Sequence, residues 1–159
     1  MTVQILFMGT AGSGKTSLIG AFEAWLRREM KVEAACVNLD PGSERLPYKP
    51  SLDVRERFTL QGIMEDEGLG PNGAMVRAME KLFKFKDEIF SRLSSIDADY
   101  LLVDTPGQAE IFLFRSSGFQ LASSLKELNP TVGVYLVDLE LASRGVIGLA
   151  TSLLLGLAS

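Results

Sequence analysis

The chain has 159 residues, of which 47% are hydrophobic and 23% are charged, and its formal net charge is −4. This length fits one domain with a sizeable buried core. The mild acidic balance excludes the basic footprint typical of proteins that bind nucleic acid or anionic membranes. One cysteine, Cys36, excludes a disulfide framework, and the absence of histidine excludes histidine bases and histidine metal ligands. The N-terminus carries no secretory-signal pattern, so we expect a cytoplasmic protein.

The segment Gly9–Thr16 fits the pattern G-x-x-x-x-G-K-[ST] of a phosphate-binding P-loop. An apolar run over residues 3–8 predicts a strand before it, and residues 17–29 predict a helix after it. A glycine-rich turn without a ligand is the alternative, but motif, position and flanks all favour phosphate binding. We expect Lys15 to reach the β- and γ-phosphates and the Thr16 hydroxyl to bind Mg²⁺. The predicted phosphate-binding residues here are Gly9, Gly12, Ser13, Gly14, Lys15, Thr16 and Ser17.

A second strand is predicted over residues 32–39, and Pro41 and Gly42 end it. Asp40 therefore follows the carboxyl end of a strand, which is the sheet edge where α/β proteins bind ligands. An aspartate before proline also starts turns. The sequence leaves both interpretations of Asp40 open.

Between residues 41 and 97 the alternation of strands and helices is interrupted. A proline-punctuated polar loop comes first, and residues 53–61 are compatible with a short helix. Gly70-Pro71-Asn72 has turn chemistry, and residues 74–96 form the longest helical pattern, with Asn72 placed to cap it. The apolar stripe of this helix is typical of a core, although it also suits a subunit interface.

A third strand over residues 100–104 ends at Asp104, and Thr-Pro-Gly-Gln follows. This pattern is typical of the magnesium and γ-phosphate sensor of P-loop GTPases. Asp104 would bind Mg²⁺ through water, the N–H group of Gly107 would approach the γ-phosphate, and Gln108 would orient water. Further on, the sequence predicts a helix over 110–128, a strand over 132–139 and an apolar helix over 145–159, which is too short to span a membrane.

The Gly-Pro-Asn tripeptide between a P-loop and Asp104-Thr-Pro-Gly-Gln resembles the signature of the GPN-loop GTPases of archaea and eukaryotes. Two further runs are similar to that family, Asn-Leu-Asp-Pro-Gly at 38–42 and Asp-Leu-Glu-Leu-Ala-Ser at 138–143. The resemblance implies a homodimer in which Asn72 contacts the γ-phosphate or the product phosphate in the partner's site, in the place of an arginine finger. It also implies that Asp40 positions the attacking water.

Other implications of the resemblance are less direct. Asp53 and Glu110 are weaker candidates for contacts with water and magnesium. Eukaryotic members act in assembling and importing RNA polymerase II, which raises a protein partner in the assembly of larger complexes, but that role does not carry over to a chain of unknown source. The family reads guanine with an Asn-Lys-x-Asp-type motif, and the chain ends at Ser159 before one. Guanine specificity is therefore implied by the resemblance alone.

We therefore expect one α/β P-loop domain over residues 1–159, with a mostly parallel sheet flanked by helices and a helical insertion between the second and third strands. Its expected function is Mg²⁺-dependent hydrolysis of GTP to GDP and phosphate. We assign catalysis to Lys15, Asp40, Asn72 and Gln108. We expect no direct binding of nucleic acid or membranes. Two alternatives remain: a P-loop phosphotransferase whose lid would be the arginine-containing stretch 55–57, and a nucleotide-gated assembly scaffold with incidental turnover.

Overall fold

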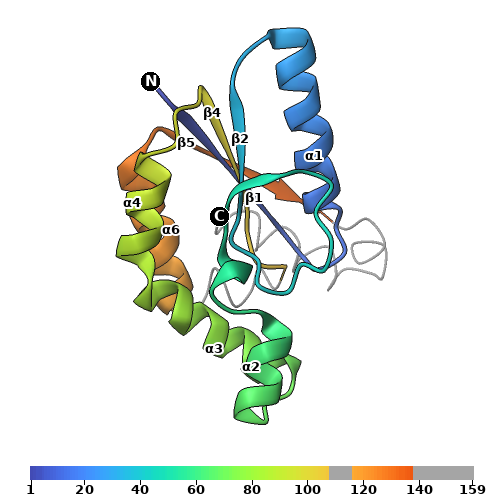
Figure 1. Ribbon diagram of the computed structural model, residues 1–159, viewed down its shortest axis with the longest axis vertical. Coiled ribbons are helices and arrows are strands. Elements are labelled where there is room, and N and C mark those ends of the chain that lie inside the picture. The colour runs from blue at the N-terminus through green and yellow to red at the C-terminus, as the bar shows by residue number, and fades with distance from the viewer. Residues whose placement is uncertain (108–115, 138–159) are drawn as a thin grey trace.

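The computed structural model describes residues 1–107 and 116–137, and the fold below is that of these residues (Figure 1). Strands alternate with helices along most of the chain. The strands are β1 (Val3–Gly9), β2 (Ala34–Asn38), β3 (Pro50–Asp53), β4 (Tyr100–Asp104) and β5 (Thr131–Leu136). The α-helices are α1 (Lys15–Trp25), α2 (Leu60–Glu67), α3 (Pro71–Lys84), α4 (Lys86–Ser94) and α6 (Ser116–Leu128). Two short helices are η1, a π-helix (Leu26–Met30), and η2, a 3₁₀-helix (Val54–Glu56).

The five strands form one sheet in the order β3-β2-β4-β1-β5, and every pairing is parallel. Strand β1 lies between β4 and β5, with Phe7 opposite Asp104 of β4 on one side and opposite Val134 of β5 on the other. The predicted parallel sheet flanked by helices is confirmed. Because all strands point the same way, the ends of β1, β2 and β4 bring the P-loop, Asp40 and Asp104 to the same edge.

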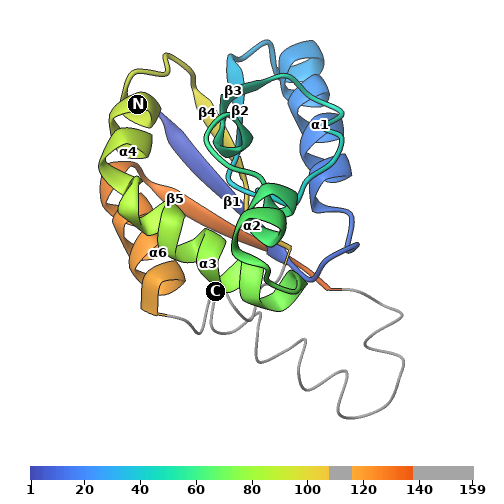
Figure 2. The same ribbon diagram turned by 60° about the horizontal axis from the view of Figure 1, so that its bottom comes forward.

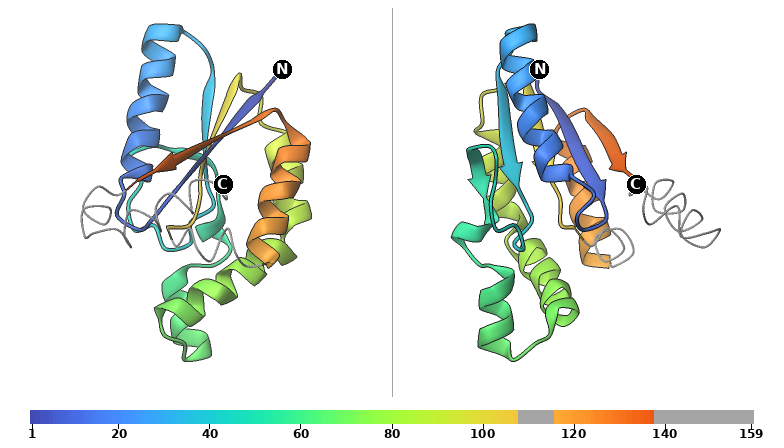
Figure 3. Two further views of the ribbon diagram at one scale, coloured as in Figure 1. Left: turned by 180° about the vertical axis from the view of Figure 1, so that it is seen from behind. Right: turned by 90° about the vertical axis from the view of Figure 1, so that its right-hand side faces the viewer.

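Alternating residues of β1 face two separate cores. Ile5 and Phe7 pack with the cluster under α1, whereas Leu6 and Met8 pack with the cluster under α3, α4 and α6. The helices accordingly cover opposite faces of the sheet, as the two views of Figure 3 show. Strands buried on both faces explain the continuous apolar runs seen in the sequence. Within the described residues, no helix combines the length and apolar character needed to cross a bilayer.

The inserted region differs from its predicted form in two places. Residues 50–53 form β3, a parallel edge strand, where the sequence predicted loop and the start of a helix. The single helix predicted over 74–96 is two helices, because the backbone of Phe85 leaves helical geometry (φ −95°, ψ 11°) and its ring stacks on Phe58. Both α3 and α4 pack beside α6, and the break lets α3 also pack against α2 (Figure 2).

The expected cap of α3 is also wrong. Pro71 is the first residue of α3 and Gly70 is its N-cap, so Asn72 lies inside the first turn. Proline suits this position because its missing N–H group would have no helical partner there. The predictions for residues 110–115 and 138–159 fall outside the described residues.

Candidate functional site

The P-loop connects β1 to α1 through a backbone in which Gly9, Gly12 and Gly14 take positive φ angles that favour glycine. Gly9 has φ +146°, and a Cβ atom there would lie 2.6 Å from the carbonyl oxygen of Leu136 in β5. Gly14, the N-cap of α1, has φ +90° in the left-handed region. The loop thus turns tightly against β5 and delivers Lys15 and Thr16 to the start of α1, where helical N–H groups favour anions.

A cavity of about 440 Å³ opens at this loop. One wall is the P-loop and the start of α1, a second is the segment after β2, and Gly107 lies between them. The lining residues are Ala11, Gly12, Gly14, Lys15, Thr16, Ser17, Asp40, Gly42, Ser43, Glu44, Arg45 and Gly107. Of the predicted phosphate-binding residues, Gly9 and Ser13 do not line this cavity. The Ser13 hydroxyl is instead buried near the position that a Cβ of Gly9 would take.

Lys15 is buried, and its ammonium group contacts the backbone of the P-loop. Its Nζ donates hydrogen bonds of 3.0 Å to the carbonyl oxygens of Gly9 and Thr10. Burial lowers the pKa of Lys15, and the nearby carboxylates of Asp104 and Asp40 oppose that shift. The nearby carboxylates help to keep Lys15 charged, and the lysine lies at the cavity wall, where a P-loop lysine meets phosphate.

Thr16 and Asp104, the two predicted metal ligands, are in direct contact. The Thr16 hydroxyl donates a 2.7 Å hydrogen bond to Oδ2 of Asp104, and the Tyr48 hydroxyl donates one of 2.9 Å to the same oxygen. Oδ1 of Asp104 is buried and has no hydrogen-bond partner among the described residues. Burial raises the pKa of Asp104, while the donors Thr16 and Tyr48 counteract this.

This set of oxygen atoms fits a magnesium ion. Mg²⁺ prefers oxygen ligands and is usually held by one or two protein groups together with water and substrate phosphates. The described residues hold no cluster of three or more histidine, cysteine or acidic side chains that would form an all-protein metal site. Thr16, which lines the cavity, and Asp104, which accepts the Thr16 hydroxyl proton from the buried side, are the residues that would hold the ion.

Asp40 forms the turn that the sequence allowed and also lines the cavity. Its Oδ1 accepts a 2.8 Å hydrogen bond from the N–H group of Gly42, which is the turn expected before proline. Its Oδ2 accepts a 3.2 Å hydrogen bond from the N–H group of Gly107, across the cavity. Burial raises the pKa of Asp40, and the Gly42 amide and Lys15 partly offset this. The carboxylate thus lies where the γ-phosphate and attacking water are expected.

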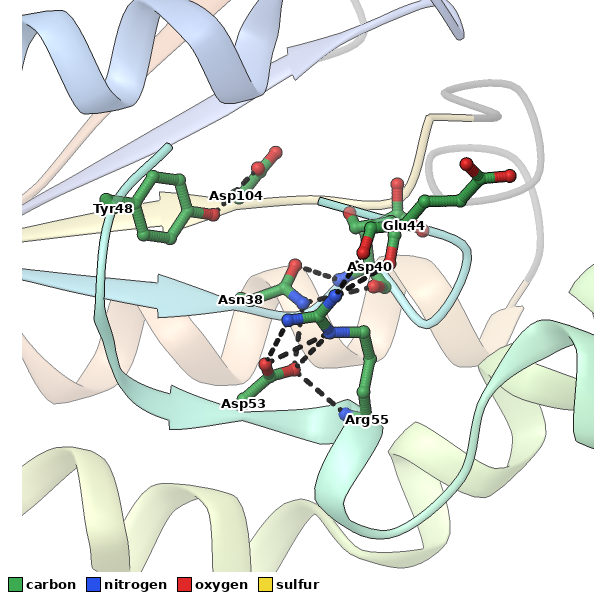
Figure 4. Close-up of polar contacts among 8 residues, drawn as sticks. Asn38, Asp40, Glu44, Tyr48, Asp53, Arg55 and Asp104 are labelled. Atoms are coloured by element: carbon green, nitrogen blue, oxygen red, sulfur yellow. Dashed lines mark hydrogen bonds and ion pairs between the residues drawn. The ribbon is translucent and has the colours of Figure 1, made fainter. Parts of the chain in front are cut away.

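A polar cluster that the sequence did not reveal supports the cavity wall from behind (Figure 4). Asp53 accepts hydrogen bonds from Nδ2 of Asn38 (2.9 Å) and from Arg55, whose Nη2 lies 2.6 Å from Oδ2. Nη1 of Arg55 also donates to the carbonyl oxygen of Ser43 at 2.8 Å. Burial opposes ionisation of Asp53, but the hydrogen bonds from Arg55 and Asn38 outweigh it and lower the pKa. These partners explain Asp53 as a structural residue of the loop.

The remaining predicted residues lie elsewhere. Asn72 is exposed in the first turn of α3, and it does not line the P-loop cavity. Gln108 and Glu110 fall outside the described residues. Arg55, the centre of the predicted kinase lid, is held by Asp53, and Arg57 pairs with Glu88. Neither arginine lines the P-loop cavity.

Known proteins resemble this chain over most of its length. A protein family described as "Conserved hypothetical ATP binding protein" matches residues 7–158. A GPN-loop GTPase of Pyrococcus abyssi is 45% identical over 142 residues, which are 88% of this chain and 55% of that protein. GPN-loop GTPase 1 of Saccharomyces cerevisiae is 38% identical over 137 residues, which are 84% of this chain and 35% of that protein.

The fold comparison agrees with the sequence comparison. The crystal structure of a GTPase in apo form from Pyrococcus abyssi matches with a TM-score of 0.75 and 44% identity, covering 84% of this chain and 52% of that chain. This chain therefore spans about half the length of the Pyrococcus abyssi relative and about a third of the length of the Saccharomyces cerevisiae relative. The P-loop cavity with its Thr16–Asp104 contact, the Gly-Pro-Asn turn and these similarities together show that the chain belongs to the GPN-loop GTPase family.

Proposed function

We propose that this domain binds GTP together with Mg²⁺ and hydrolyses it to GDP and phosphate, and that it acts as a homodimer. The observation that carries the proposal is the convergence of Lys15, Thr16 and Gly107 on one cavity, with Asp104 hydrogen-bonded to Thr16 directly behind the wall. The names of the relatives supply the choice of GTP. A cytoplasmic location, and a protein partner in the assembly of larger complexes, remain part of this proposal.

The chain's own residues divide the work of in-line attack by water. The P-loop N–H groups and Lys15 stabilise charge on the β- and γ-phosphates, where fixed donors matter most. Bound Mg²⁺ would neutralise charge on the same oxygens, held by Thr16 and by Asp104 through water. Asp40 and Gln108 orient the attacking water. The N–H group of Gly107, which now binds Asp40, becomes a donor to the γ-phosphate.

The position of Asn72 supports its action in trans. Its turn lies at the free end of the α2–α3 pair, away from the sheet (Figures 1 and 3). An exposed turn that projects in this way is suited to enter the site of a second copy. Mixing Asn72→Ala chains with Lys15→Ala chains should restore part of the activity, because some mixed dimers contain one intact composite site. Mixed samples no more active than either variant alone would refute action in trans.

The direct test of nucleotide binding is Lys15→Ala, with Lys84→Ala as the matched control for loss of an exposed lysine outside the cavity. Affinities for fluorescent GTP and ATP should fall strongly in Lys15→Ala and stay unchanged in Lys84→Ala. Tight binding retained by Lys15→Ala would refute the P-loop assignment. Equal affinity of the wild type for GTP and ATP would refute the choice of base.

Product analysis separates hydrolysis from the alternatives. Release of inorganic phosphate from GTP supports hydrolysis, whereas a phosphorylated acceptor would show a phosphotransferase. The structure disfavours the latter, because Arg55 and Arg57 are engaged outside the P-loop cavity. A scaffold would be recognised if Asn72→Ala kept full turnover and lost binding to a protein partner.

A further inference from the structure

Tyr48 is a buried residue that links the loop after β2 to Asp104, the carboxylate proposed to hold Mg²⁺. Its side chain is 8% exposed, and its ring packs in the apolar cluster under α1. Its hydroxyl reaches out of this cluster and donates a 2.9 Å hydrogen bond to Oδ2 of Asp104. Residues 42–45 of the same loop line the nucleotide cavity. Figure 4 shows the Tyr48 hydroxyl directed at Asp104.

The two oxygen atoms of Asp104 have different surroundings. Oδ2 accepts two hydroxyl protons, one from Thr16 and one from Tyr48. Oδ1 is buried and lacks a partner among the residues that the structure describes. Two donors on one oxygen fix the rotation of the carboxylate, so Oδ1 keeps its lone pairs for a ligand. Thr16 gives its only hydroxyl proton to Asp104, which leaves the lone pairs of its oxygen available as well.

We propose that Tyr48 is a positioning residue for the magnesium site: by binding Oδ2 of Asp104, it fixes the carboxylate so that Oδ1 faces the metal-bound water. The hydrogen bond also ties the 41–49 loop to the metal carboxylate, so the strength of magnesium binding depends on the placement of that loop. This inference rests on the proposed Mg²⁺–nucleotide function.

A purely structural role would have a different signature. If the Tyr48 hydroxyl served only to form a hydrogen bond in the core, its removal would lower stability or nucleotide affinity equally with and without metal. A positioning role instead affects the step in which Mg²⁺ strengthens nucleotide binding. The two roles are therefore separated by comparing nucleotide affinity with and without the metal.

The experiment uses Tyr48→Phe, which keeps the ring and removes the hydroxyl. The matched control is Tyr100→Phe, since Tyr100 packs against the same cluster. Dissociation constants for fluorescent GDP and GTP are measured in EDTA and in saturating Mg²⁺, together with a magnesium titration and thermal unfolding without nucleotide. A hydrogen bond to a carboxylate is worth enough that its loss should reduce the magnesium-dependent gain in affinity about tenfold.

We expect Tyr48→Phe to match the wild type within about twofold in EDTA and to lose most of the gain on adding Mg²⁺, while Tyr100→Phe behaves as the wild type. An undiminished gain in Tyr48→Phe would overturn the inference. An equal loss of affinity in both conditions would overturn it too, in favour of a packing role. If the wild type itself gains nothing from Mg²⁺, the proposed function fails instead.

Discussion

The Arg55–Asp53 pair provides the sharpest prediction on stability. Arg55→Met removes the guanidinium but keeps most of the aliphatic stem. It breaks the contacts of Nε with both carboxylate oxygens (3.0 Å each), of Nη2 with Oδ2 (2.6 Å), and of Nη1 with the carbonyl oxygen of Ser43 (2.8 Å). The Asp53 side chain is 11% exposed and would then keep the Asn38 amide as its side-chain donor.

The magnitude follows from how far water can reach the pair. Removing one partner of a fully buried ion pair costs about 3–5 kcal/mol. The Arg55 side chain is 22% exposed, so water can partly solvate the freed carboxylate, and we expect the free energy of unfolding to fall by roughly 2–3 kcal/mol. For a chain of this length, this corresponds to a fall in the melting temperature of about 5–10 °C.

The assay is urea and thermal unfolding of the wild type, Arg55→Met, Asp53→Asn and the double variant. Because the neutral amide introduced by Asp53→Asn needs no counter-charge, the double variant should lose at least about 1 kcal/mol less than the sum of the single losses. Asp53 has a lowered pKa, so its contribution is present above the usual carboxyl pKa of 3.8 and lost as pH falls through the folded-state pKa. A loss below about 1 kcal/mol at neutral pH, or strict additivity, would refute the reasoning.

Three further predictions concern other sites. Gly9→Ala should lower the free energy of unfolding by more than about 2 kcal/mol in urea titration, because its backbone is strained for alanine and its Cβ meets Leu136; helical Gly73→Ala, with ordinary contacts only, should not destabilise. Cys36, whose pKa burial raises to about 12, should react with iodoacetamide only after unfolding, and rapid native labelling would contradict its burial. Burial raises the pKa of Asp40, so wild-type stability should fall as pH rises from 3.8 through that raised pKa, and the fall should be smaller in Asp40→Asn, in which Asp104 still contributes.

The parts that the sequence could predict are those whose determinants are local. The P-loop and the strand and helix beside it are consecutive in the chain, and the spacing of glycine, lysine and threonine indicates phosphate binding. Asp104 could be predicted because it ends an apolar strand and precedes Thr-Pro-Gly-Gln. The shared edge of a parallel sheet then brings Asp40 to the same cavity. These predictions depend on strand direction and on no distant side chain.

The parts that could not be predicted depend on contacts between distant residues or on competing local signals. Pro50 argued against a strand, yet proline is tolerated at the first residue of an edge strand, and this is its position in β3. Phe85 continues an apolar helical pattern, and the helix breaks where its ring stacks on the distant Phe58. Tyr48 carries no motif, and its partner Asp104 is 56 residues away in the chain. Arg55 joins its neighbour Asp53 to the carbonyl oxygen of Ser43, which is 12 residues away.

The direction in which the Gly-Pro-Asn turn points depends on the number of residues in α3. The 14 residues of α3 pack against α6 and α2, and the Gly-Pro-Asn turn lies at the N-terminal end of this helix. One residue inserted into α3 would rotate the turn by about 100° around the helix axis and advance it by ~1.5 Å. The length of α3, counted in turns, therefore sets where the tip points, so substitutions within this helix are tolerated more readily than insertions or deletions.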